Sequence, residues 1–205
     1  SYKGQIVTMT YPLIGNYGVN SEDIESKGIS AEGFIVREYS RVCSNWRANE
    51  TLSDYLKRNN IMGIEDVDTR AITRHIRIKG SLKAVLSTID MNNDSLIGKA
   101  KASDSLVGRD LVREVTCQGP YRWNESGKYR VAVLDCGVKY NMLRELVNRD
   151  CQVTVFNAQV KTSEIMEYDP HGILLSNGPG DPEGAPYVFN SVRELLGKVP
   201  IFGIC

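Results

Sequence analysis

The segment Gly172-Ile-Leu-Leu-Ser-Asn-Gly-Pro-Gly-Asp-Pro182 joins an apolar strand pattern directly to a turn rich in glycine and proline. Asn-Gly and Pro-Gly pairs are strong turn signals, so we expect a rigid turn over 177–182. A second apolar pattern, Val199-Pro-Ile-Phe-Gly-Ile-Cys205, ends in Gly-x-Cys. A strand that runs into Gly-x-Cys is typical of the first half of a nucleophile elbow, a sharp strand-to-helix turn that presents a reactive side chain. We therefore expect Cys205 to be a nucleophile.

Strand and helix patterns alternate regularly around these two segments. We expect strands at 130–135, 152–156, 172–176 and 200–204, and helices at 141–148, 162–168 and 187–196. Such alternation implies right-handed crossovers and a parallel sheet with helices on both faces. Ligands bind beyond the carboxyl ends of the strands in these sheets. The turn at 177–182 and Cys205 both end strands on that edge, so we expect them to lie close together.

The first 119 residues are less regular and predict a separate mixed α/β domain with undetermined strand pairing. We expect strands at 5–10, 33–38 and 83–87, and helices at 51–58 and 68–78. Thr51 followed by Asp54 resembles a capping box at the start of the first helix. The turn-rich segment 117–127 is the candidate boundary, which gives domains at 1–119 and 129–205.

Composition is that of an ordinary globular protein, with 41% hydrophobic and 24% charged residues among 205. Lys plus Arg and Asp plus Glu both number 25, so no net charge favours nucleic acid or an anionic membrane as a partner. The apolar runs are too short to cross a bilayer. Five cysteines without a Cys-x-x-Cys pair argue against a disulfide framework or a metal site and favour a reducing, cytoplasmic setting. Because residue 1 is Ser rather than Met, we expect the true N-terminus upstream.

A cysteine nucleophile requires a histidine base, and the sequence contains two histidines. His171 precedes the strand at 172–176, so at ~3.3 Å per strand residue it should lie about 20 Å from the glycine turn. His75 lies among cationic residues on the predicted helix at 68–78. We therefore expect the base to lie beyond residue 205. Cys136 follows the strand at 130–135 on the ligand edge, and we interpret it as a packing thiol.

Each of these features also has a purely structural interpretation. A cysteine that ends an apolar strand can be a small buried hydrophobe. The turn at 177–182 can be a rigid connection only. In the functional alternative, its backbone N–H groups face a developing oxyanion or a substrate carboxylate, and its glycines allow a ligand to approach closely.

The motifs together resemble a known family. Leu175–Pro182 followed by Pro200–Cys205 resembles the class I (triad) glutamine amidotransferase domain. Further segments are similar to the small chain of glutamine-dependent carbamoyl phosphate synthetase, and the resemblance runs over essentially the whole chain. These segments are Gln5–Pro12, Ile14–Asn16, Leu52–Ile61, Asp66–Arg70 and Asp135–Asn141.

This resemblance implies that Cys205 forms a glutamyl thioester during glutamine hydrolysis. It implies that Gly178 and Gly180 contact glutamine through their backbone, that the Gly178 amide helps to hold the oxyanion, and that Ser1 contacts glutamine from the N-terminal domain. Ammonia would pass to a large synthetase subunit, in a heterodimer, for carbamoyl phosphate synthesis from bicarbonate and ATP in arginine and pyrimidine biosynthesis. No cofactor or metal is expected in this chain, and ATP and Mg are expected on the large subunit.

The implied fold is a mixed α/β N-terminal domain, with its start missing, followed by a flavodoxin-like parallel sheet. The sheet domain would be incomplete, because the family's catalytic His and Glu lie beyond residue 205. We therefore expect the isolated fragment to be inactive. Two alternatives stay open. One is another triad amidotransferase serving nucleotide or aromatic biosynthesis, against which the segment 5–70 argues. The other is a non-catalytic, amidotransferase-like binding or regulatory partner.

Overall fold

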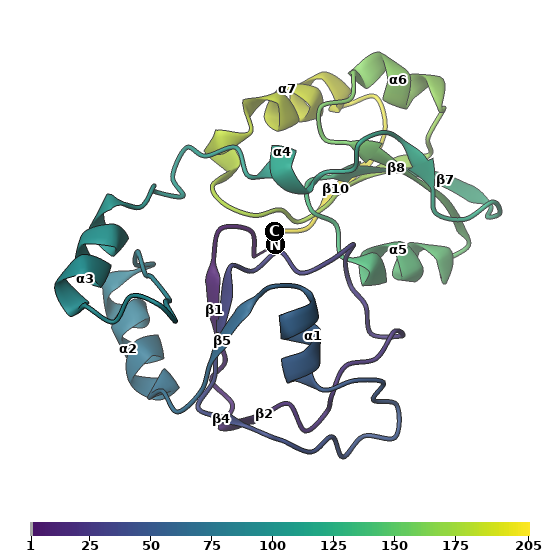
Figure 1. The fold of residues 1–205 in the computed structure, drawn as a ribbon. Coiled ribbons are helices and arrows are strands. Elements are labelled where there is room, and N and C mark those ends of the chain that lie inside the picture. Colours follow the sequence, from purple (N-terminus) through teal and green to yellow (C-terminus); the bar gives the residue numbers. More distant parts are fainter. Residues whose placement is uncertain (1) are drawn as a thin grey trace. The chain divides into compact units, whose positions relative to one another are not determined.

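The structure is a computed structural model that describes residues 2–205, so the predicted substrate contact at Ser1 lies outside the described residues. The chain forms two compact units (Figure 1). The first comprises 25–27 and 106–205, and the second comprises 2–24 and 28–105. This division lies upstream of the predicted boundary at 117–127, because the segment that begins at Leu106 packs with the C-terminal sheet.

The first unit is built on one sheet, in the strand order β10-β9-β7-β8-β6. The first four strands of this order are parallel, and the short β6 pairs antiparallel with β8 at the edge. In chain order, the parallel strands follow the flavodoxin-like arrangement 2-1-3-4. The predicted parallel sheet and fold class are therefore confirmed. The strands are β6 (Tyr121–Arg122), β7 (Tyr129–Asp135), β8 (Cys151–Asn157), β9 (Gly172–Leu175) and β10 (Ile201–Gly203).

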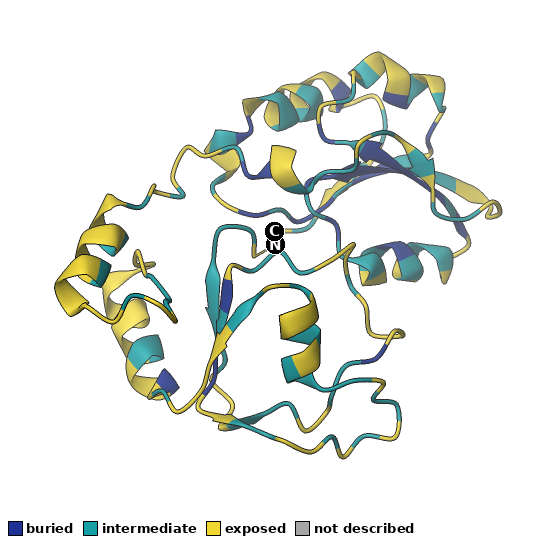
Figure 2. Ribbon diagram, viewed as in Figure 1, coloured by how far each residue is buried: buried dark blue, intermediate teal, exposed yellow. Residues whose placement is uncertain are grey.

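Helices cover both faces of this sheet, as the alternation predicts. Successive strand side chains point to opposite faces, and Val133 and Leu134 in β7 belong to different core clusters. Val133 packs in the cluster of Leu143, whereas Leu134 packs in the cluster of Ile165 and Leu195. Both strand residues are buried, and Figure 2 shows the sheet as the main buried region of this unit. The helices are α5 (Tyr140–Val147), α6 (Thr162–Glu167) and α7 (Pro186–Leu195).

Helix α5 receives its N-terminal cap from a distant segment. Within the described chain, the side chain of its N-cap residue, Lys139, makes no capping hydrogen bond to the first turn. Instead, the carbonyl oxygen of Glu25 accepts from Tyr140 N at 2.9 Å, and its carboxylate accepts from Asn141 N at 2.9 Å. The same carboxylate pairs with Arg144 at 2.8 Å. Two of the N–H groups that a helix leaves unsatisfied at its start are therefore bonded by Glu25.

The second unit contains a three-stranded parallel sheet in the order β1-β3-β5 and a smaller pair, β2 with β4. Thr51 caps α1 as predicted, because its hydroxyl accepts from Asp54 N at 3.1 Å. The reciprocal bond differs from a capping box, since the Thr51 hydroxyl donates to the Asp54 carboxylate at 2.7 Å. The elements are β1 (Ile6–Thr8), β2 (Leu13–Ile14), β3 (Gly33–Ile35), β4 (Glu38–Tyr39), α1 (Leu52–Arg58), β5 (Met62–Ile64), α2 (Thr69–Lys79) and α3 (Asn93–Ala102).

The predicted strand at 83–87 is wrong, because this segment has no regular secondary structure. Lys83 Nζ donates to the carbonyl oxygens of Lys101 and Ser103. The Leu86 side chain occupies the space that a Cβ on Gly33 would need, with only 2.6 Å between the two positions. The segment therefore attaches to its unit through side-chain contacts rather than through a strand ladder.

Candidate active site

Cys205 directly follows β10 at the carboxyl edge of the sheet. Ile204 N donates to Leu175 O at 3.0 Å, which continues the pairing of β10 with β9 up to the cysteine. The Cys205 backbone has φ 72°, in the left-handed region that non-glycine residues rarely adopt, and the residue is exposed. A strained backbone directly after a strand is the geometry expected of a nucleophile elbow.

The glycine turn begins on the neighbouring strand at the same edge. Strand β9 ends at Leu175, which is the register partner of Gly203 in β10. Because β9 and β10 are parallel, the turn at 177–182 and Cys205 leave the sheet at adjacent carboxyl ends. The structure therefore brings together the two features that the sequence singled out. The roles of Cys205, Gly178 and Gly180 toward a substrate stay predictions.

Packing at Gly178 and backbone conformation at Gly180 favour glycine at both positions of the turn. A Cβ on Gly178 would lie 2.7 Å from the carbonyl oxygen of Cys136. Gly180 has φ 73°, and a Cβ there would lie 3.1 Å from Leu111 Cδ1. Gly203 differs, because a Cβ would meet no described atom closer than Leu175 Cβ at 4.0 Å. Among the described residues, close packing therefore does not require glycine at position 203.

Burial separates the other thiols of this edge from Cys205. Cys136 is 5% exposed, and burial, with a smaller contribution from the charge of Asp135, raises the pKa of its thiol to about 12. The same two causes raise the pKa of Cys117 to about 11. Since the thiolate is the reactive form of cysteine, neither is suited to nucleophilic attack near neutral pH. Cys205 is the exposed thiol at this edge.

Sequence reasoning missed Asp135, a buried carboxylate at the end of β7. It is 5% exposed and accepts three backbone hydrogen bonds, from Gly137 N and Val138 N at 2.9 Å and from Cys117 N at 2.8 Å. The available signal was an acidic residue that ends an apolar run and stands two positions before a glycine, a pattern typical of a side chain that bonds its own turn.

The two histidines belong to different units, and only His171 shares a unit with Cys205. His171 precedes β9 at the opposite end of the strand, where its Nδ1 accepts from Arg130 N at 2.8 Å. His75 lies on α2 in the other unit and is exposed. Within its unit, His171 is therefore not placed as a base for Cys205, and the position of the base stays a prediction.

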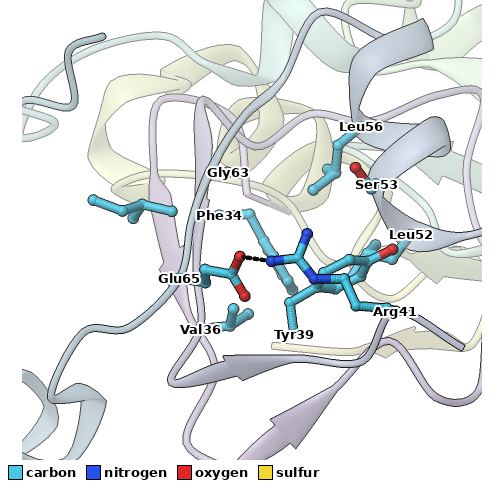
Figure 3. Close-up of a pocket in the computed structure, with 10 residues that line it drawn as sticks. Phe34, Val36, Tyr39, Arg41, Leu52, Ser53, Leu56, Gly63 and Glu65 are labelled. Carbon is cyan, nitrogen blue, oxygen red and sulfur yellow. Dashed lines mark hydrogen bonds and ion pairs between the residues drawn. The ribbon is translucent and has the colours of Figure 1, made fainter.

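Within residues 2–205, no three His, Cys, Asp or Glu side chains gather in a way that could hold a metal ion. None of the described helices has the length and apolar character that crossing a membrane requires. A hollow of about 140 Å³ lies in the second unit beside α1, with Phe34 and Leu56 in its lining and the Arg41–Glu65 ion pair at 2.5 Å (Figure 3). It is smaller than the roughly 300 Å³ at which ligand pockets begin.

Comparison with known families assigns both halves of the chain. The model of the carbamoyl-phosphate synthase small chain, CPSase domain, matches residues 1–86, and the model of class-I glutamine amidotransferases matches residues 132–205. The chain belongs to the carbamoyl-phosphate synthase small-chain family. The amidotransferase match contains the glycine turn and Cys205.

Curated relatives agree with this family along the whole chain. The carbamoyl phosphate synthase small chain of Syntrophotalea carbinolica is 50% identical over 219 residues, and that of Rhodopirellula baltica is 44% identical over 226 residues. Both alignments cover 100% of this chain and 58% of the relative. The chloroplastic small chain of Arabidopsis thaliana is 45% identical, with 100% of this chain and 51% of the relative covered. The chain thus spans little more than half the length of these small-chain relatives.

Proposed function

We propose that this chain is the glutamine-hydrolysing component of a carbamoyl-phosphate synthase. The observation that carries the proposal is the placement of an exposed, strained Cys205 beside the glycine turn, at adjacent carboxyl ends of β9 and β10. A carboxamide is a poor electrophile, so its hydrolysis needs both a strong nucleophile and donors for the developing oxyanion. The membership of the family makes glutamine the proposed amide.

In the proposed reaction, Cys205 Sγ attacks the side-chain amide carbon of glutamine, and the backbone N–H of Gly178 helps to bind the oxyanion. The C–N bond then breaks, the nitrogen takes up a proton and leaves as ammonia, and a glutamyl thioester remains on Cys205. Water hydrolyses the thioester to glutamate and restores the thiol. The proton transfers are assigned to a histidine, oriented by a glutamate, beyond residue 205. Gly180 and Ser1 are the further proposed glutamine contacts.

The proposed partner is a large synthetase subunit. It would accept the ammonia and form carbamoyl phosphate from bicarbonate and ATP with Mg, for arginine and pyrimidine biosynthesis. One relative, from Halalkalibacterium halodurans, is named a pyrimidine-specific small chain. No cofactor is proposed for this chain itself. The proposed location is the cytoplasm.

The test is covalent labelling of the full-length protein with a glutamine analogue that carries an electrophile, followed by peptide mapping and an assay of glutamate release. We expect one adduct, on Cys205, protection by glutamine, and loss of glutamate release in Cys205→Ser. An adduct on Cys136 would overturn the assignment of the nucleophile. Absence of both labelling and glutamate release would favour the non-catalytic alternative.

A polypeptide limited to residues 1–205 provides a second arm of this test. We expect it to release no glutamate above background, because its two histidines are His75 and His171. Glutamate release near the rate of the full-length protein would contradict this expectation and the assignment of the base.

A further inference from the structure

The carboxylate of Asp135 binds two chain segments that are distant in sequence. Its Oδ1 accepts from Gly137 N and Val138 N, and its Oδ2 accepts from Cys117 N, 18 residues earlier. All three N···O distances are 2.8–2.9 Å. Asp135 is thereby a single junction between the turn after β7 and the segment that enters the sheet domain at 109–117.

The turn after β7 forms one wall of the glycine turn. The backbone of Gly178 packs directly on Cys136, and a Cβ on Gly137 would lie 3.4 Å from Pro179 Cδ. Ser176 connects the two turns by hydrogen bonds, because its hydroxyl accepts from Cys136 N at 2.9 Å and donates to Asn177 O at 2.9 Å. The position of the Gly178 backbone therefore depends on the turn that Asp135 holds.

The segment at 109–117 forms a second wall. Its Leu111 is 1% exposed and packs against Gly180. The segment includes the short helix α4 (Val112–Val115) and ends at Cys117, which is held from both sides. Asp135 accepts from the Cys117 N–H, and Asn157 Nδ2 donates to the Cys117 carbonyl. Asp135 and Asn157 are register partners at the ends of β7 and β8, so they form a clamp on one residue.

We propose that Asp135 is a positioning residue that sets the Gly178–Gly180 backbone for the reaction at Cys205. This inference rests on the proposed function. A carboxylate accepts on both oxygens, whereas an asparagine has one acceptor oxygen and an NH₂ that faces an N–H donor. Asp135→Asn therefore releases one of the two walls without changing side-chain size. Misplacement of reacting groups by about 1 Å costs of the order of 10²-fold in rate, so even a partial shift of the turn is measurable.

The experiment compares Asp135→Asn with Asp169→Asn in the full-length protein. Asp169 is a matched control, because it is an exposed aspartate of the same unit that pairs with Arg130 near His171, at the opposite end of the sheet. Hydrogen exchange of the peptide 176–184 is measured beside that of 199–203. The second readout is kcat for glutamate release, expressed per thiol titrated with the glutamine-like electrophile.

In Asp135→Asn we expect exchange in 176–184 to accelerate at least tenfold and kcat per titrated thiol to fall at least tenfold. The peptide 199–203 and the Asp169→Asn variant should remain unchanged. A purely structural role would lower the number of titratable thiols and leave kcat per thiol intact, and that result overturns the proposal. Unchanged exchange in 176–184 also overturns it.

If Asp135→Asn does not fold, Asn157→Ala carries the test, since it removes the bond to the Cys117 carbonyl, together with the bond that Asn157 Oδ1 accepts from Gln159 N at 2.7 Å. The same direction of change with a smaller magnitude supports the proposal, and no change in either readout overturns it. Failure of the proposed function is distinguishable, because it abolishes glutamate release in the wild type, whereas the exchange comparison still reports on Asp135.

Discussion

Asp135 and Cys136 are adjacent buried residues at the end of β7, and they differ in how the fold accommodates their side chains. The carboxylate accepts hydrogen bonds from three N–H donors, while burial keeps the adjacent thiol protonated in the fold near neutral pH. Burial is the larger cause of the raised thiol pKa, and the charge of Asp135 adds to it. Burial therefore keeps the Cys136 thiol unreactive beside the turn that we propose binds the substrate.

This thiol should make stability depend on pH in an alkaline window. The pKa of Cys136 rises from 9.0 to about 12 on folding, so between these values the thiol is protonated in the folded state and ionised in the unfolded state. Unfolding then releases a proton, and the free energy of unfolding falls with rising pH by up to about 1.4 kcal/mol per pH unit. Below pH 9 this contribution is constant.

Urea unfolding of wild type and Cys136→Ala at pH 8 and pH 10.5 checks this expectation. The variant should lose less stability between the two pH values than the wild type does. Equal losses in the two proteins would show that the thiol is already ionised in the fold or remains protonated in the unfolded chain.

At the scale of elements, the two glycine-containing strand ends differ although they lie side by side. Gly178 follows β9 in a turn that is crowded by the Cys136 backbone, whereas a Cβ on Gly203, at the end of β10, would meet no described atom closer than Leu175 Cβ at 4.0 Å. Backbone atoms cannot move aside as a flexible side chain does. A side chain at position 178 therefore cannot be accommodated without a shift of the backbone of the turn.

The matched pair Gly178→Ala and Gly203→Ala tests this difference. We expect Gly178→Ala to lower the free energy of unfolding by about 1–3 kcal/mol, because its Cβ must displace backbone. Gly203→Ala should be neutral or slightly stabilising, since alanine reduces the entropy of the unfolded chain. Chemical denaturation of both variants provides the measurement, and similar costs at the two positions would contradict the packing described for the turn.

At the scale of the whole chain, Glu25 connects a segment near the N-terminus to α5. Its carboxylate bonds Asn141 N across 116 sequence positions and also pairs with Arg144. A negative charge at a helix N-terminus is favourable, and here it satisfies an N–H that the helix's own N-cap side chain leaves open. A contact of this kind makes the first unit discontinuous in sequence.

Loss of this cap should weaken the first unit. We expect Glu25→Ala to reduce its stability by about 1 kcal/mol, the usual cost of removing a side-chain cap. Glu22→Ala is the control, because Glu22 is exposed and lies 3.6 Å from Arg47. Hydrogen exchange of the α5 amides should accelerate in the first variant only. Equal exchange in both variants would mean that Glu25 adds nothing to α5.

Local pattern was sufficient for the four parallel strands of the first unit and for α5, α6 and α7, whereas the short α4 and β6 were missed. The four parallel strands and the three helices that cover them were predicted to within one or two residues, because each has a strong apolar period. The pattern failed where the period is faint. Helix α3 was missed, since its apolar Ile97 is 52% exposed and the helix buries none of its residues. The short β5 was missed, since it is three residues long and has glycine at its centre.

The order of residues alone therefore predicted the parallel sheet. It also predicted that the glycine turn and Cys205 lie at one edge of this sheet, because strand direction and turn chemistry are local properties. Only the tertiary structure identified Asp135 as the junction of two walls, Glu25 as the cap of α5, and burial as the main cause of the raised pKa of Cys136, which the sequence already indicated as a packing thiol. The hydrogen bonds of Asp135 and Glu25 join segments that are 18 and 116 positions apart, and the burial of Cys136 depends on the packed core. No local sequence pattern encodes such contacts.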